Sequence, residues 1–96
     1  MVRSDQIEST IIKLKPILKQ QFAVEKIGYF GSFARDEQTE NSDLDILVSF
    51  DKPIGWAFFD LQELLENELK IKVDLVSVNA LKEQLKNSIL EQAKFI

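Results

Sequence analysis

The residue types and spacings that could do chemistry lie between positions 31 and 45. Gly31 and Ser32 are followed by ten residues and then by Asp43, Leu44 and Asp45. Side chains two positions apart in a strand share a face, so Asp43 and Asp45 are expected to lie together. Neighbouring carboxylates repel each other, and a divalent cation relieves that repulsion. The spacing therefore predicts metal-assisted chemistry on a phosphate.

The Gly31-Ser32 pair offers a phosphate cradle. Glycine lets a phosphate approach the backbone closely, and the free amides at the start of a helix attract anions. The alternative is that Gly31 makes a tight turn and Ser32 caps a helix, with no ligand present. The pair alone favours this second interpretation, because Gly-Ser is common.

Asp74 is the third acidic candidate, in the apolar run Lys72 to Val78. A buried carboxylate without a partner costs on the order of several kcal/mol, so an acid there needs a reason. If its strand lies beside that of Asp45, Asp74 can join the pair around two cations. The alternatives are an exposed aspartate on an edge strand, or an ion pair with Lys72 or Lys26.

Arg35 is expected in the first turn of a short helix, where a cation opposes the helix dipole. An unfavourable cation beside a phosphate cradle indicates a phosphate contact. A salt bridge to Glu37, Glu40 or the aspartate pair explains it equally well.

Helices and strands must bring these residues together, and the apolar spacing predicts where they lie. A helix capped by Ser4 should bury one apolar stripe, and Pro16 should kink it or begin a second helix. The short reach from Gly31 to Asp43 makes the first two strands antiparallel. We predict an α/β fold with a small, mixed, three-stranded sheet packed with helices. The predicted stripe is Ile7, Ile11, Leu14, Leu18 and Phe22; the strands are Lys26 to Phe30, Leu44 to Phe50 and Ile71 to Val78; the later helices are Trp56 to Leu69 and one capped by Asn79 with the stripe Leu81, Leu85, Ile89, Ala93 and Ile96.

Trp56 begins the helix that runs to Leu69 but points away from its apolar side. We expect Trp56 to lie at an interface, and Phe58 and Phe59 to pack in the core.

Composition limits the remaining possibilities. The 96 residues form one domain, 1–96, and contain no cysteine and no histidine, so a bound metal must take hard oxygen ligands. That favours magnesium or manganese over zinc. The net charge of −4 and the pI near 4.8 disfavour direct nucleic-acid binding. No apolar run reaches membrane-spanning length, so a cytoplasmic location is expected.

Three segments together resemble the nucleotidyltransferase superfamily of DNA polymerase β, and most closely its minimal nucleotidyltransferases (MNT). The resemblance implies that Gly31 and Ser32 hold the β- and γ-phosphates of ATP. Asp43 and Asp45 would bind two Mg²⁺ ions, and Asp74 would complete one site and help to deprotonate the attacking hydroxyl. Nucleotide contacts are also predicted from Arg35 and Ser42. The segments are Phe30-Gly31-Ser32-Phe33-Ala34-Arg35, Ser42-Asp43-Leu44-Asp45-Ile46-Leu47-Val48 and Val73-Asp74-Leu75-Val76.

The resemblance also implies a partner. MNT proteins are encoded with helical HEPN proteins, which are RNase toxins that the MNT protein neutralises by transferring AMP to a tyrosine. We therefore expect an antitoxin that forms a hetero-oligomer with a HEPN-type protein encoded nearby. Two alternatives remain: the catalytic subunit of a small-molecule nucleotidyltransferase, and a module that inhibits its partner by docking alone. One departure is Asp36, where the family usually has glycine after the arginine.

Overall fold

Four strands form one mixed sheet in the computed structural model, which describes residues 2–96. The strand order is β3-β2-β1-β4; β1 pairs antiparallel with β2 and β4, and β2 pairs parallel with β3. The expected mixed sheet and the antiparallel first pair are confirmed. The elements are α1 (Ser4–Phe22), β1 (Val24–Phe30), η1 (Gly31–Phe33), β2 (Leu44–Phe50), α2 (Ala57–Leu69), β3 (Val73–Ser77), η2 (Val78–Ala80), α3 (Glu83–Gln92) and β4 (Lys94–Phe95).

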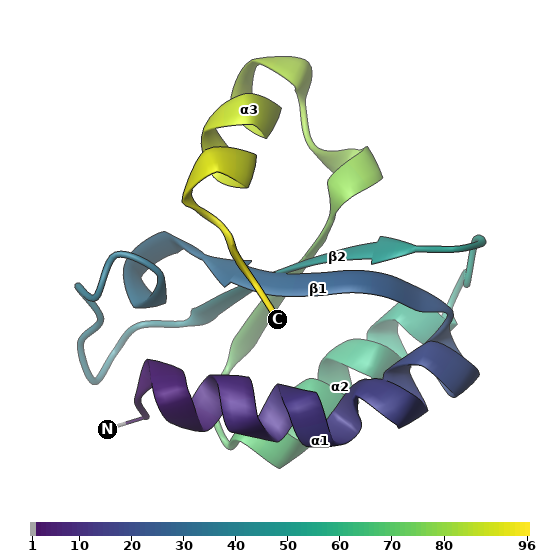
Figure 1. The fold of residues 1–96 in the computed structure, drawn as a ribbon, viewed down its shortest axis with the longest axis horizontal. Helices are drawn as coiled ribbons and strands as arrows, with labels where there is room; N and C mark the ends of the chain where they lie inside the picture. The colour runs from purple at the N-terminus through teal and green to yellow at the C-terminus, as the bar shows by residue number, and fades with distance from the viewer. Residues whose placement is uncertain (1) are drawn as a thin grey trace.

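The sheet has helices on both faces. In Figure 1, α1 and α2 lie below the sheet and α3 lies above it. The main core lies between the sheet and the first two helices, and α3 contributes no buried residue to it. The face toward α3 is therefore the less covered of the two. The core residues from α1, α2 and β2 are Ile7, Ile11, Leu14, Leu18, Leu61, Leu65, Leu69, Leu44, Ile46 and Val48.

The first helix runs through Pro16 as a single element, so the alternative that a second helix begins there is wrong. Proline removes the hydrogen bond to the carbonyl four residues earlier, which belongs to Ile12. Both Pro16 and Ile12 lie on the exposed side, where water can satisfy that carbonyl. The expected apolar stripe does face the core, but Arg3, not Ser4, is the N-cap residue.

The C-terminal region departs further from the prediction. The sheet has four strands instead of three, because the two residues of β4 pair with Gly28 and Tyr29. Two residues are too few to show strand alternation in a sequence. The last helix begins at Glu83, whereas Asn79, the expected cap, lies in η2.

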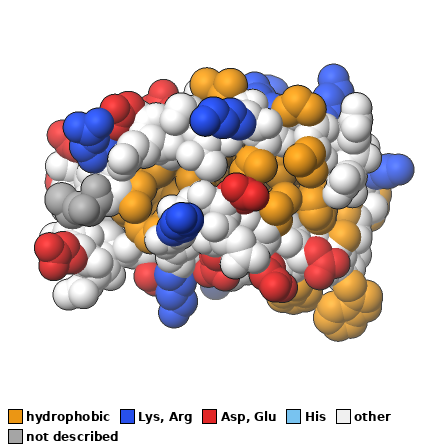
Figure 2. Space-filling model, turned by 90° about the horizontal axis from the view of Figure 1, so that it is seen from below, with side chains coloured by type: hydrophobic (Ala, Val, Ile, Leu, Met, Phe, Trp, Pro, Cys, Tyr) orange, Lys and Arg blue, Asp and Glu red, His pale blue; other side chains and the backbone are white. Residues whose placement is uncertain are grey.

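The surface over α1 and α2 carries exposed apolar side chains (Figure 2). Trp56 is 84% exposed, as expected for a residue outside the core. Phe59 is 58% exposed and stacks on Trp56 with ring centroids 5.8 Å apart, so its predicted core position is wrong. Phe58 packs against the core as expected. None of the helices within residues 2–96 combines the length and apolar character needed to span a membrane.

Candidate active site

Strand register brings Asp45 and Asp74 side by side. They are direct partners in the parallel ladder between β2 and β3. Neighbouring strands lie about 4.8 Å apart, so the two carboxyl groups extend from adjacent positions on one face. That face is opposite the core, because the alternate residues Leu44 and Ile46 are fully buried against α1 and α2. Asp43 directly precedes β2.

Asp74 is exposed, because β3 is the edge strand of the sheet. Burial therefore does not force a partner on Asp74, contrary to expectation, and its exposure matches the alternative of an edge-strand aspartate. Among residues 2–96, neither Lys72 nor Lys26 forms an ion pair with it. The register with Asp45 alone places Asp74 in the site.

Gly31 is held against Asp45 at the end of β1. Its neighbour Phe30 pairs with Asp45 across the antiparallel ladder, and Gly31 has a φ of 74°, in the left-handed region. A Cβ atom at Gly31 would clash with Oδ2 of Asp45. The backbone conformation therefore favours glycine, and a side chain there would also have to displace the carboxyl group of Asp45. Gly31 and Asp45, the first and last residues of the sequence motif, therefore lie against each other.

The turn after Gly31 is a 3-10 turn fastened to the first helix. The N–H groups of Ala34 and Arg35 donate to the carbonyl of Gly31, each at 3.1 Å. Phe33 is buried, and its carbonyl accepts a hydrogen bond of 3.3 Å from the Ser4 hydroxyl. The turn that carries Ser32 is thus held in place by packing and by α1.

Burial raises the pKa of Asp45, and the charges of Asp74 and Asp43 raise it further, while Arg35 lowers it. The shift means that the three carboxylates repel one another across the site. In the described chain the salt bridges join Arg3 with Asp5 and Arg35 with Glu37, so no cation pairs directly with this cluster.

Mg²⁺ fits this set of side chains by its chemistry. Carboxylate oxygens are its preferred ligands, and uncompensated negative charge favours its binding. Within residues 2–96, however, no three acidic side chains lie close enough to hold a metal ion as they stand. The backbone places Asp43, Asp45 and Asp74 near one another, and the side chains must turn inward to share a cation.

Residues 12–96 match the family model described as polymerase beta nucleotidyltransferase. The chain belongs to this family. Protein adenylyltransferase MntA of Thermococcus cleftensis is 38% identical over 97 residues, covering 100% of this chain and 98% of the relative. The chain is thus a nucleotidyltransferase.

Solved structures show the same fold as this nucleotidyltransferase. A toxin–antitoxin crystal structure with AMP-PNP is 30% identical, with a TM-score of 0.76 over 92% of this chain and 70% of that one. A tri-AMPylated Shewanella oneidensis HEPN toxin in complex with MNT antitoxin is 26% identical, with a TM-score of 0.69, covering 95% and 69% of the two chains. The fold of this chain is therefore that of the minimal nucleotidyltransferases.

Two further predicted site residues of the nucleotidyltransferase are engaged within the protein. Arg35 Nε lies 3.3 Å from a Glu37 carboxylate oxygen. This salt bridge is one of those predicted as an alternative to a phosphate contact. Exposed pairs of this kind are weak, so a phosphate can compete for Arg35. The Ser42 hydroxyl accepts a 2.9 Å hydrogen bond from the Thr39 N–H and so shapes the loop before Asp43. A nucleotide contact from Ser42 stays a prediction.

The structure explains the usual glycine at the position of Asp36. Asp36 has a φ of 58°, in the left-handed region that glycine adopts without cost. Aspartate is among the few other residues that enter this region readily. The loop therefore keeps its conformation in this nucleotidyltransferase, with one added negative charge.

Sequence reasoning missed Gln92, the last residue of α3. Its side-chain oxygen accepts hydrogen bonds from the Gly31 N–H at 3.2 Å and from Arg35 Nη1 at 3.0 Å. Gly31 therefore contributes its conformation to the site, and its own amide is already bonded. No sequence pattern links positions 31 and 92.

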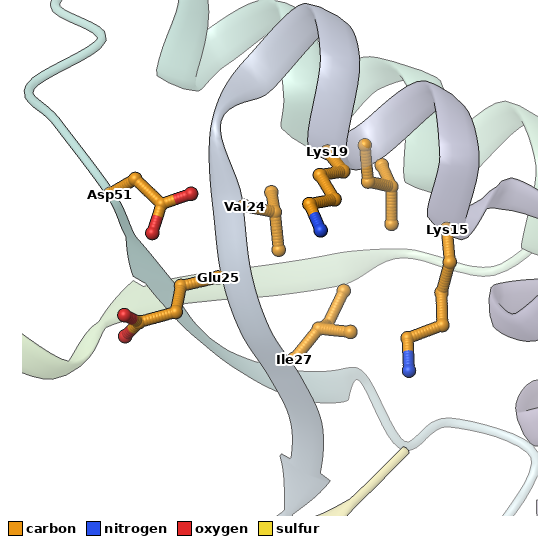
Figure 3. Close-up of a pocket in the computed structure, with 7 residues that line it drawn as sticks. Lys15, Lys19, Val24, Glu25, Ile27 and Asp51 are labelled. Carbon is orange, nitrogen blue, oxygen red and sulfur yellow. The ribbon is translucent and has the colours of Figure 1, made fainter.

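The cavity shown in Figure 3 lies away from the carboxylates of Asp43, Asp45 and Asp74. Its volume is about 260 Å³, and its lining includes Asp51, which follows the last residue of β2. Asp43 precedes the first residue of that strand, so the full strand separates the cavity from the site. Lys15 and Lys19 of α1 also line it.

Proposed function

We propose that this nucleotidyltransferase transfers AMP from ATP to a hydroxyl group of a partner protein, and that it acts as the antitoxin of a HEPN RNase toxin. The observation that carries the proposal is the convergence of the Gly31 turn on the register pair Asp45 and Asp74. The name of the Thermococcus cleftensis relative and the complex of an AMPylated HEPN toxin with its MNT antitoxin support the choice of AMP and of a HEPN partner.

The residues of the chain divide the work of the reaction. Ser32 and the Gly31 turn would bind the terminal phosphates, and Arg35 would neutralise part of their charge. Asp43, Asp45 and Asp74 would hold Mg²⁺, which neutralises the triphosphate and stabilises charge in the transition state when bound.

Asp74 is exposed, so it can meet a hydroxyl group presented by another protein. It would accept the hydroxyl proton as that oxygen attacks the α-phosphorus. A new P–O bond forms to the acceptor, and the bond to the β-phosphate oxygen breaks. Pyrophosphate leaves with the electron pair of that bond. With no histidine in the chain, a carboxylate is the natural base at this position.

A labelling experiment tests the proposal. The protein is incubated with ATP labelled at the α-phosphate, Mg²⁺ and a HEPN-type helical protein. Label should appear on the partner, and the double variant Asp43→Asn/Asp45→Asn should transfer none. Label on a small alcohol without any protein acceptor would instead support the small-molecule alternative. Equal transfer by wild type and double variant, or none by wild type, would overturn the proposal.

The cytoplasmic location expected from the sequence belongs to the same proposal, since ATP and an intracellular RNase are found there. Cell fractionation with an antibody to the chain tests it. Recovery in the membrane or secreted fraction would contradict it.

A further inference from the structure

Gln92 links the C-terminal part of the chain to the nucleotide site. It ends α3 and is half-buried, and its side-chain oxygen accepts from both the Gly31 N–H and Arg35 Nη1. Its side-chain nitrogen points back to the carbonyl of Ser88, at 3.5 Å. The amide oxygen thus faces the two donors, and the amide nitrogen faces its own helix.

The position of Gln92 is fixed by the sheet. The strand β4 begins two residues later and pairs with Gly28 and Tyr29 of β1. A Cβ atom at Gly28 would lie only 2.6 Å from the Lys94 carbonyl oxygen, so the two backbones are in close contact. The Ile96 N–H also donates to the Ile27 carbonyl at 2.9 Å. Gln92 is therefore attached to the same strand that ends at Gly31.

Arg35 is held at two of its nitrogens. Nε contacts Glu37 at 3.3 Å and Nη1 contacts Gln92 at 3.0 Å, while within residues 2–96 no side chain accepts from Nη2. A guanidinium carries five N–H donors in a planar fork. Two anchors fix the plane of that fork and leave the donors of Nη2 for a ligand. Glu37 is largely exposed, so the half-buried Gln92 is the firmer of the two anchors.

Gln92 is also neutral. It accepts a hydrogen bond from Arg35 without cancelling the charge of the guanidinium, so that charge stays available to a polyphosphate. Holding a flexible side chain in its binding position before the ligand arrives removes the entropic cost of ordering it on binding.

We propose that Gln92 is a positioning residue for the triphosphate: it orients Arg35 and fixes the Gly31 turn before the nucleotide binds. This inference rests on the proposed function, because it assumes that a nucleoside triphosphate occupies the site. It adds α3 and β4 to the elements that build the site. It also assigns a role to a residue outside the three segments that carry the family resemblance.

The test measures equilibrium binding of AMP-PNP with Mg²⁺, which needs no acceptor protein. Gln92→Leu keeps the size of the side chain but removes the acceptor, and it should weaken binding about five- to tenfold. Gln92→Glu keeps an acceptor oxygen for both donors but adds a negative charge that cancels part of the Arg35 charge, so it should bind more weakly than wild type. Gln84→Leu makes the same change on an exposed position of α3 and should bind like wild type.

A double-variant cycle shows whether the effect passes through Arg35. Arg35→Ala should weaken binding, and adding Gln92→Leu to it should weaken binding no more than twofold further. A full additional five- to tenfold loss would overturn the orientation of Arg35 by Gln92, and equal or tighter binding by Gln92→Leu alone would overturn the whole inference. Tighter binding would mean that Gln92 competes with phosphate for its donors.

Urea unfolding of each variant separates positioning from stability. If Gln92→Leu is unfolded, Gln92→Ser replaces it, because serine is too short to reach both donors. Loss of folding in both variants would assign Gln92 a structural role and overturn the inference. If the wild type itself binds no nucleotide, the proposed function fails; if it binds and Gln92→Leu binds equally, only this inference fails.

Discussion

Replacing Asp45 with asparagine should make the metal-free protein more stable at neutral pH and should remove its stabilisation by Mg²⁺. Asp45 lies beside Asp74 in the ladder and near Asp43, and no lysine or arginine in the described chain pairs with the cluster. The charge of Asp45 therefore opposes folding until a cation binds. Removing it relieves the repulsion and also removes a proposed metal ligand.

The size of the effect follows from the strand spacing. Two unit charges about 5 Å apart repel by about 0.8–1.7 kcal/mol at an effective dielectric constant of about 40 to 80, suited to a site with one exposed member. We expect Asp45→Asn to raise the free energy of unfolding by about 1 kcal/mol. In a domain of this size that corresponds to about 4–8 °C in the melting temperature.

The pH dependence has a definite sign. Burial, Asp74 and Asp43 raise the pKa of Asp45 above its ordinary value of 3.8, so the folded protein holds the proton more tightly than the unfolded chain. The resulting stabilisation is complete below 3.8 and is lost as the pH rises through the raised pKa. The stability advantage of Asp45→Asn should therefore be largest near pH 7 and should disappear toward pH 4.

Urea unfolding from pH 4 to pH 8, with EDTA or with Mg²⁺, measures both effects. Glu63→Gln, which removes an exposed carboxylate from the middle of α2, is the matched control and should behave as wild type. The reasoning is refuted if Asp45→Asn is less stable than wild type at pH 7 in EDTA. It is also refuted if Mg²⁺ stabilises both proteins equally.

Three further substitutions test the surroundings of the site. Gly31→Ala should lower the unfolding free energy by about 1–2 kcal/mol, because φ is positive there, and should abolish transfer by displacing Asp45; activity near wild type would contradict this. Asp36→Gly should raise the melting temperature, reflecting about 1 kcal/mol of relieved left-handed strain, and a lower value would contradict the explanation of the loop. Tyr29→Phe removes a 2.6 Å hydrogen bond to Glu8 and should cost about 1–2 kcal/mol in urea unfolding. Since burial and Glu8 raise the pKa of Tyr29 to about 12, the wild type should lose stability between pH 10 and 12, and this variant should not.

The strands that carry the site could be predicted from the sequence because their patterns are local. The range Leu44 to Phe50 was predicted without error, since alternate residues from Leu44 to Val48 face the core. The antiparallel turn at Gly31 followed from the short reach to Asp43. The resemblance carried by the three segments gave the fold and the family.

The features that depend on pairing between distant segments could not be predicted. Whether Asp74 is buried depends on which strand occupies the edge of the sheet, and no local pattern states that order. The strand β4 is too short to recognise, and Gln92 meets Gly31 only because β4 pairs with β1. Phe59 differs, because it stands outside the helical spacing of the core residues Leu61 and Leu65, so its contact with Trp56 at the surface could have been predicted from the sequence.

The most direct test of the site is to locate a metal ion crystallographically. Crystals of the wild type with AMP-PNP and Mn²⁺ would show the metal by its anomalous scattering. We predict Mn²⁺ bound by the carboxylates of Asp43 and Asp45, with Asp74 turned toward it and the triphosphate against the Gly31 turn and Arg35. A metal ion bound elsewhere, or an Asp74 side chain turned away from the bound nucleotide, would contradict the account.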